Sequence, residues 1–403
     1  DKLVYTSDKA SDDLSRPFGF RLDDESTTEG VYLAADRLHK ERRYGEALDK
    51  YLDCIARDPR HVRALVRAAE LYARRGQYDK ALARARTALE NAMYDPDANY
   101  IFGVISRRLG RLADAKEALG WAARSLDHRS NAYGLMAEIA IQERAPERAL
   151  EYAGRAIESD GDNLNAFDVL ATTLRLLNER GRAAGVLERI NKADPLHHLA
   201  RFERFLLGPD PARLKAFQSP IQNEFPQETY QELAHYYIRL GLVGDAARLL
   251  ELCPASPAAG IWLAYLTRSA APAESAAHLD KALAISPWLV FPFREEDIPA
   301  FEWAAGERPG DWTPKYYLAL ILWSKGRMDE AETLLEQCSE SDFAPLFLAR
   351  AALRSADAPD KAEEDLTKAV AIDPQAWRAR HALSRFHLDR GRISEALETT
   401  ARS

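Results

Sequence analysis

The sequence predicts an all-α fold, a right-handed superhelical solenoid built from antiparallel helix pairs. One 34-residue pattern occurs five times between residues 28 and 197 with no insertion or deletion. Each copy has an alanine at the start of its second helix: Ala47, Ala81, Ala115, Ala149 and Ala183. Twelve residues earlier stands another small residue, in the order Ala35, Ala69, Gly103, Ala137 and Ala171. Small residues at both positions let the two helices of a pair touch, and a fixed period of this length indicates stacked repeats.

The second repeat illustrates the expected helix pair. Apolar residues recur at helical spacing over 63–75, and a second apolar stripe runs over 81–89. Gly76 lies between them and ends the first helix, because glycine takes a left-handed backbone conformation at no steric cost. The equivalent turns are expected at 42–45, 109–112 and 179–182, and each contains a glycine.

This period and its pattern of small residues resemble the tetratricopeptide-repeat (TPR) family. A single helix pair cannot cover its own apolar face, so neighbouring pairs stack and bury a continuous core. The resemblance covers nearly the whole chain after residue 27. It implies the fold and a role in binding other proteins, but it does not name a ligand.

The pattern divides the chain into four parts. Residues 1–27 do not fit the repeat and are expected to form an N-terminal arm or a linker from a preceding domain, with Ser26, Thr27 and Thr28 as candidate helix caps. Residues 28–197 are five regular 34-residue TPR units. Residues 198–311 are irregular TPR-like units with an aromatic-rich insertion at 287–311, and residues 312–403 are C-terminal TPR units.

The insertion is the least regular part. Pro287, Pro292 and Pro299 disfavour a regular helix, so an extended segment is expected in place of one first helix. The final helix, expected over 393–402, is amphipathic, and no polar capping helix follows it. A solenoid normally ends with such a helix, so either the natural chain continues or this end self-associates.

A second resemblance begins in the insertion. The sequences 291–296, 312–318 and 323–327 are similar to the helical-repeat part of a bacterial family whose N-terminal β-rich domain resembles carbohydrate-active enzymes. That resemblance implies a preceding domain, which agrees with a chain that begins at Asp1 rather than Met. A fragment or processed product is therefore expected, so the absence of a signal peptide says nothing about location.

Charge and composition exclude several classes of partner. The formal net charge is −8, with 55 basic and 63 acidic residues mixed along the chain. Nucleic acids and anionic membranes require a basic stripe, so neither is an expected partner. No apolar run has the roughly 20 residues that a membrane-spanning helix needs.

The three cysteines indicate structural roles. Cys54, Cys253 and Cys338 occupy the same repeat position, seven residues after the alanine that opens the second helix. We interpret them as small buried residues rather than catalytic or metal-binding thiols. They form no CxxC pair, and this slightly favours a reducing compartment such as the cytoplasm.

The first helix of each pair is expected to line the concave face of the solenoid. The predicted groove residues are Tyr32, Asp36, His39, Arg63, Glu70, Asp97, Tyr100, Arg107, Glu138, Asp168 and Arg175. Their mixed charges suit an extended peptide, although a solvated polar face explains them equally well. Tyr32 and Asp36 stand where chaperone-binding members of the family have Lys and Asn, so a clamp for a C-terminal carboxylate is excluded.

Aromatic residues in and after the insertion form a second candidate surface. They are Trp288, Phe291, Phe293, Trp303, Trp312 and Tyr316. Tryptophan and tyrosine favour interfaces, so these residues either contact a partner domain or glycan or fill the gap left by the missing helix.

Catalytic motifs are absent from the sequence. The nine histidines form no metal-ligand spacing, and no phosphate-binding loop or nucleophile elbow is found. The sequence therefore predicts a non-catalytic scaffold with no cofactor and no metal, which binds a peptide or a partner domain in its groove. The alternative is the accessory repeat domain of a larger carbohydrate-processing bacterial protein.

Overall fold

The computed structural model describes residues 24–338 and 341–401, which form 23 α-helices and one short 3-10 helix and contain no strand. The prediction of an all-α solenoid of helix pairs is confirmed. The first five pairs are α1 (Thr28–Lys40) with α2 (Tyr44–Arg57), α3 (Val62–Arg74) with α4 (Tyr78–Asn91), α5 (Pro96–Arg108) with α6 (Leu112–Ala122), α7 (Leu126–Gln142) with α8 (Pro146–Ser159), and α9 (Leu164–Leu176) with α10 (Arg180–Ala193).

The later pairs are less regular. Three pairs follow: α11 (His198–Leu207) with the short α12 (Pro211–Gln218), α13 (Pro226–Arg239) with α14 (Val243–Glu251), and α15 (Pro257–Thr267) with α16 (Pro272–Leu283). Residues 286–294 contain no helix, and η1 (Glu295–Asp297) and α17 (Ile298–Glu307) follow without a partner helix. The chain then forms α18 (Thr313–Ser324) with α19 (Met328–Glu336), α20 (Ala344–Arg354) with α21 (Pro359–Ile372), and α22 (Trp377–Asp389) with α23 (Ile393–Ala401).

Side-chain caps fix where most of the early first helices begin. Thr27 Oγ1 accepts a hydrogen bond from the Gly30 amide at 3.0 Å. The residues one, two, four and five repeats later make the same kind of bond: His61, Asp95, Asn163 and His197. These caps satisfy amides that have no partner inside the helix. The candidate cap Thr27 is thus confirmed, whereas residues 1–23 of the predicted arm lie outside the described residues.

The turns inside the pairs differ in one respect from the expectation. A left-handed residue recurs every 34 positions, at Arg42, Gly76, Gly110, Arg144 and Asn178. The left-handed residue is therefore Arg42 in the first pair and Asn178 in the fifth pair, and the glycine of each turn lies further along the chain. The turn geometry is set by stacking of the repeat, so non-glycine residues adopt it at some cost.

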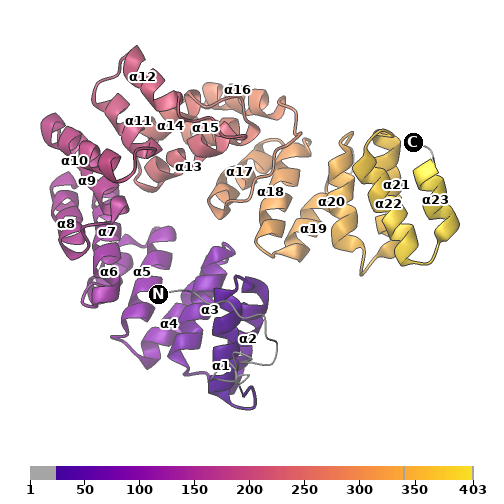
Figure 1. The fold of residues 1–403 in the computed structure, drawn as a ribbon, viewed down its shortest axis with the longest axis horizontal. Coiled ribbons are helices and arrows are strands. Elements are labelled where there is room, and N and C mark those ends of the chain that lie inside the picture. The colour runs from indigo at the N-terminus through magenta and orange to yellow at the C-terminus, as the bar shows by residue number, and fades with distance from the viewer. Residues whose placement is uncertain (1–23, 339–340, 402–403) are drawn as a thin grey trace, which may run out of the picture.

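The solenoid curves back toward its own beginning. In Figure 1 the pairs from α1 to α16 follow an arc, and α17 and α18 lie across from α3, while α19–α23 continue outward as an arm. The approach is close, because a Cβ added to Gly76 would lie 3.2 Å from Ile298 Cδ1. We call the space enclosed by this arc the lumen.

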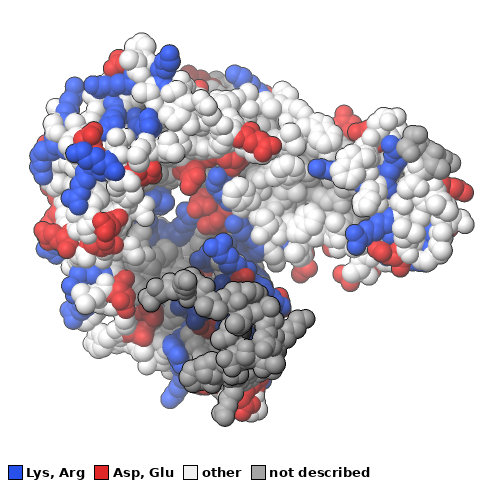
Figure 2. Space-filling model, viewed as in Figure 1, with Lys and Arg blue, Asp and Glu red and all other residues white. Residues whose placement is uncertain are grey.

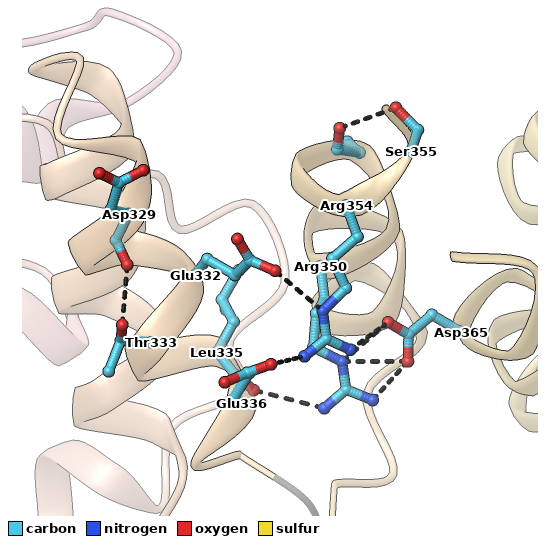
Figure 3. A network of polar contacts seen from close by, with 10 residues as sticks. Asp329, Glu332, Thr333, Leu335, Glu336, Arg350, Arg354, Ser355 and Asp365 are labelled. Carbon is cyan, nitrogen blue, oxygen red and sulfur yellow. Dashed lines mark hydrogen bonds and ion pairs between the residues drawn. The ribbon is translucent and has the colours of Figure 1, made fainter. Parts of the chain in front are cut away.

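A partly buried ionic network joins the first three helices of the outward arm. Figure 3 shows Arg350 and Arg354 of α20 pointing at Asp365 of α21, while Arg354 also reaches Glu332 and Glu336 of α19. Arg354 Nη1 lies 3.1 Å from Asp365 Oδ2, and both residues are buried. Because Arg354 pairs with acids of both α19 and α21, the network holds three consecutive helices in one arrangement.

The cysteines fill the core as predicted. Cys54 and Cys338 are buried, Cys253 is partly buried, and all three are free thiols. Burial raises the pKa of Cys54 and Cys338 to about 11 and that of Cys253 to about 12. A thiol with so high a pKa is a poor nucleophile at neutral pH, so these cysteines have a packing role.

Candidate functional site in the lumen

A pocket of about 520 Å³ lies in the lumen between the early helices and η1. Figure 2 shows acidic and basic side chains gathered in the hollow at this place. The lining residues are Glu70, Ala73 and Arg74 of α3, Tyr78 of α4, Ile101, Val104, Ile105, Arg107 and Arg108 of α5, Gln142 of α7, Ile238 and Arg239 of α13, and Glu295 and Glu296 of η1. We call it the lumen pocket.

The pocket combines an apolar wall with charges of both signs. Ile101, Val104 and Ile105 recur on one side of α5, as the helical period requires. Four arginines and three glutamates complete the lining. Such a surface suits a ligand that carries both apolar and charged groups.

One side of the pocket is held by Glu138 of α7. Its Oε2 lies 2.5 Å from Arg107 Nη2 and 3.1 Å from Arg239 Nε. Arg239 belongs to α13, and Gln142 also donates a hydrogen bond to its carbonyl oxygen. These bonds join α7 to a helix three pairs later and bury the Glu138 side chain.

The opposite side is held by Arg108 of α5 and the two glutamates of η1. Arg108 Nη2 lies 3.1 Å from Glu296 Oε1 and 3.5 Å from Glu295 Oε1. Arg108 Nε also donates to the Tyr78 hydroxyl at 2.9 Å. We call these ion pairs, together with the approach of Gly76 to Ile298, the lumen closure.

A buried aspartate anchors η1 to the inner wall. Asp297 is 1% exposed, and its Oδ1 accepts hydrogen bonds from Trp262 Nε1 at 2.6 Å and from the His235 ring at 2.9 Å. The following helix begins at Ile298, so this anchor fixes the position of both glutamates. A helix start favours acidic residues, which accounts for the acids at 295–297 but not for these partners.

The two glutamates of the closure differ in acidity. Burial and the neighbouring charge of Glu296 raise the pKa of Glu295. Burial also opposes ionisation of Glu296, but the Arg108 guanidinium and backbone hydrogen bonds outweigh it and lower the pKa of Glu296. Arg108 therefore favours one ionised carboxylate at the pocket rim.

The predicted groove residues at the N-terminal end lie close together, and one of them, Tyr32, is buried with 7% exposure. The Arg63 guanidinium lies 4.4 Å from the centre of the Tyr32 ring and also pairs with Glu29. Asp36 pairs with Lys40 at 2.7 Å, and His39 lies 3.7 Å from Glu70. Of this group only Glu70 reaches the lumen pocket.

Three predicted groove residues lie in the third pair, namely Asp97, Tyr100 and Arg107. The Tyr100 ring stacks on the His128 ring with centroids 4.6 Å apart, and Asp97 pairs with the same imidazole at 2.5 Å. Asp97 keeps 62% of its side chain exposed. These residues are therefore accessible but lie outside the pocket, whereas Arg107 of the same helix lines it.

The last predicted groove residues are buried. Arg175 Nε lies 2.7 Å from Glu203, which is 1% exposed, and Arg175 Nη2 lies 2.7 Å from Asp245. Asp168 is 6% exposed and lies 3.4 Å from the His197 ring. Burial and the charge of Glu203 raise the pKa of Asp168 well above its usual range. Together with Glu138, these side chains serve contacts within the chain rather than an open groove.

The structure divides the aromatic candidates into two groups. Tyr316 is 3% exposed, and Trp312 stacks on Phe343 with ring centroids 5.8 Å apart, so both belong to the core. Trp303 is partly buried against Tyr265. Exposed large side chains remain on the segment after α16, namely Trp288, Leu289, Phe291 and Phe293.

Several pocket residues were not singled out from the sequence, namely Arg74, Arg108, Arg239, Gln142, Glu295 and Glu296. They belong to different pairs, and no local spacing relates them. Among the described residues no cluster of histidine, cysteine and acidic side chains could hold a metal ion. No helix in the described part is long and apolar enough to cross a membrane.

Comparison with known families agrees with the helix pairing. Models of the tetratricopeptide repeat match residues 298–342 and 353–403. The model of the TT21 fifth ARM repeats domain matches residues 29–141. No curated protein matches the chain.

Several solved structures are similar over parts of the chain. YrrB, described as a TPR protein with an unusual peptide-binding site, is 21% identical over 44% of this chain and 91% of its own, with a TM-score of 0.38. MamA is 17% identical over 41% of this chain and 91% of its own, with a TM-score of 0.37. The C-terminal part of a TPR repeat-containing protein from Cytophaga hutchinsonii is 19% identical over 67% of this chain and 98% of its own, with a TM-score of 0.39. The two family matches and the regular helix pairs show that the chain contains tetratricopeptide repeats in an all-helical repeat fold, a kind of fold that supports a protein-interaction scaffold in general.

Proposed function

We propose that this scaffold binds an extended segment of a partner protein in the lumen pocket. The observation that carries the proposal is the pocket itself, with a volume of about 520 Å³, an apolar wall on α5 and charges of both signs at its rim. A segment that alternates apolar and charged side chains matches this lining, because apolar groups lose contact with water while the charges find opposite partners.

The remaining predicted groove surface would extend this site. Tyr32, Asp36, Arg63, Asp97 and Tyr100 lie on the first helices of pairs one to three, which lead toward the pocket. Tyr32 is buried, but Asp36, Arg63 and Asp97 pair with Lys40, Glu29 and His128, and ion pairs near the surface are weak enough to exchange partners.

The test uses a photo-crosslinking amino acid in place of Val104, which lines the pocket. In cells that express the full chain, we expect one protein to be crosslinked from this position. The control places the same group at Ala113, an exposed residue of α6 that lies outside the pocket. A synthetic peptide from the crosslinked region should then bind the purified chain in calorimetry.

A pocket-filling variant completes the test. Ile238→Trp introduces a larger side chain into the pocket and should abolish peptide binding while the helical circular dichroism spectrum is retained. Peptide binding that is unchanged in this variant, or equal crosslinking from positions 104 and 113, would contradict the proposal. The alternative role, as accessory domain of a carbohydrate-processing bacterial protein, stays a prediction from the sequence.

A further inference from the structure

A second pocket, of about 560 Å³, lies between α10, α11 and α12. It shares no lining residue with the lumen pocket. Its charged lining consists of Arg180, Arg201, Arg204, Arg213 and Glu188, and the remaining residues are small or aliphatic. We call it the arginine pocket.

Two of the four arginines have no carboxylate partner among the described residues. Arg201 donates to the backbone carbonyls of Ala216 at 3.2 Å and Pro195 at 2.6 Å, which are neutral acceptors. Arg180 donates only to the side-chain carbonyl of Asn178, at 3.2 Å. Both guanidinium groups thus keep their full charge without an opposite charge beside them.

The other two arginines are each paired with one acid. Arg204 Nη2 lies 3.0 Å from Glu188 Oε2, and Arg213 Nε lies 3.3 Å from Asp210 Oδ2. Two carboxylates therefore balance two of the four guanidinium charges. The pocket keeps an excess of two positive charges, although the whole chain carries a net charge of −8.

The backbone positions these arginines in advance. Arg201, Arg204 and Arg213 each donate to a backbone carbonyl oxygen, namely that of Ala216, Leu187 and Gly208 respectively. Their guanidinium groups are therefore held in place before any ligand arrives, and less entropy is lost on binding. Figure 2 shows Lys and Arg side chains gathered over the region of α10–α12.

We propose that the arginine pocket binds a phosphate monoester carried by a segment of a partner protein. A phosphorylated side chain carries about −1.5 to −2 charges at neutral pH, which matches the excess of the pocket. Guanidinium groups bind phosphate and carboxylate oxygens through paired hydrogen bonds. The higher charge of a phosphate monoester favours it over a single carboxylate in a pocket with two excess positive charges. The volume exceeds that of a bare ion, so the residue that carries the phosphate also fits.

The test measures binding of a blocked pentapeptide with phosphoserine at its centre and glycine elsewhere, by calorimetry with the full chain. We expect saturable binding to one site. Arg180→Glu should weaken it by at least about tenfold, the scale of one charge-assisted hydrogen bond. Ala184→Glu should weaken binding by a similar factor, because it adds a negative charge to the pocket lining. Ala184 is exposed and makes no side-chain hydrogen bond, so this variant should keep the fold.

The matched control is Arg182→Glu, which makes the same charge change on the same helix. Arg182 does not line the arginine pocket, and it pairs with Glu179 at its exposed position. We expect this variant to change the affinity by less than about twofold, because Arg182 does not line the arginine pocket and its exposed charge acts on a ligand there only through solvent. Circular dichroism would show that all three variants are folded.

Four outcomes would overturn the proposal. The first is no saturable binding of the phosphopeptide at concentrations up to about 10 mM, and the second is equal weakening by Arg182→Glu. The third is equal affinity for the same peptide with glutamate in place of phosphoserine. That result would show that the pocket does not require the second negative charge of a phosphate monoester. The fourth is tighter binding of inorganic phosphate than of the phosphopeptide, which would assign the pocket to a small anion instead of a partner protein.

Discussion

Replacing Arg108 by methionine should open the lumen closure while the rest of the solenoid stays folded. Methionine keeps an apolar stem beside Tyr78 but removes the hydrogen bonds to Tyr78, Glu295 and Glu296. The two glutamates then keep Lys325 as their remaining ion-pair partner, 3.5 Å from Glu295. One end of η1 loses its main attachment to α5.

The magnitude follows from the exposure of the three charges. Exposed ion pairs contribute about 0–1 kcal/mol, whereas breaking a buried pair costs about 3–5 kcal/mol. The side chains of Arg108, Glu295 and Glu296 are 29%, 23% and 32% exposed, which lies between these cases. We therefore expect the closure to lose about 2–3 kcal/mol, which makes opening roughly 30- to 150-fold more frequent.

Hydrogen exchange measures this opening directly. The amide of Asp297 donates to the Arg294 carbonyl at 3.1 Å and should exchange faster by that factor. Arg111→Met is the control, because it changes an exposed arginine of the next turn that has no contact with η1. At about 1 M salt the wild-type chain should approach the variant, since screening weakens partly exposed pairs. Less than threefold faster exchange, or an equal effect in Arg111→Met, would refute the role of Arg108.

Three further predictions concern stability. A Cβ at Gly103 would lie 2.8 Å from Leu119 Cγ, so Gly103→Ala should lower the thermal midpoint at a cost of about 1–3 kcal/mol. Gly134 has open space around it, so Gly134→Ala should raise stability by about 0.5–1 kcal/mol. Equal effects of the two substitutions would contradict this packing. The pKa of Asp168 is raised in the folded state, so its contribution to stability falls as the pH rises above the ordinary aspartate range. Asp168→Asn should therefore raise the thermal midpoint at pH 8. A gain in thermal midpoint that did not shrink toward pH 4 would contradict this direction of the pKa shift. Trp303→Ala should lower the free energy of unfolding in denaturant by about 2–3 kcal/mol, because Trp303 packs against the core. Trp288 is more exposed, so Trp288→Ala should lower it by about 1 kcal/mol or less. A larger loss of stability for Trp288→Ala would reverse the assignment of Trp303 to the core and Trp288 to the surface.

Local chemistry made the fold predictable. Helix starts are set by capping side chains such as Thr27 and Asp95, which act within three residues. Turn residues recur at the 34-residue period, although the left-handed position falls on a non-glycine residue in three pairs, namely Arg42, Arg144 and Asn178. Because each repeat contacts mainly its neighbours, such local signals add up to the correct architecture.

The candidate site was predictable only in part. Glu70 and Arg107 are two predicted groove residues that line the lumen pocket, and the helical period determines the side of a helix on which a residue lies. It could not show that Glu138 would be buried by Arg239, since these residues are three pairs apart and no local pattern relates them. The net charge similarly concealed the arginine pocket, because acidic residues elsewhere outweigh it.

The sequence by itself determined the repeat, the helix pairs, the small residues at their contacts and the structural role of the cysteines. These depend on interactions between residues that are close along the chain or one repeat apart. Only the tertiary structure decided how far the solenoid curves, where η1 meets α5, and which charged side chains remain open to a ligand. Curvature accumulates from small rotations between successive pairs, and the short α11–α12 pair and the missing helix before η1 alter that sum in ways that no local sequence signal specifies.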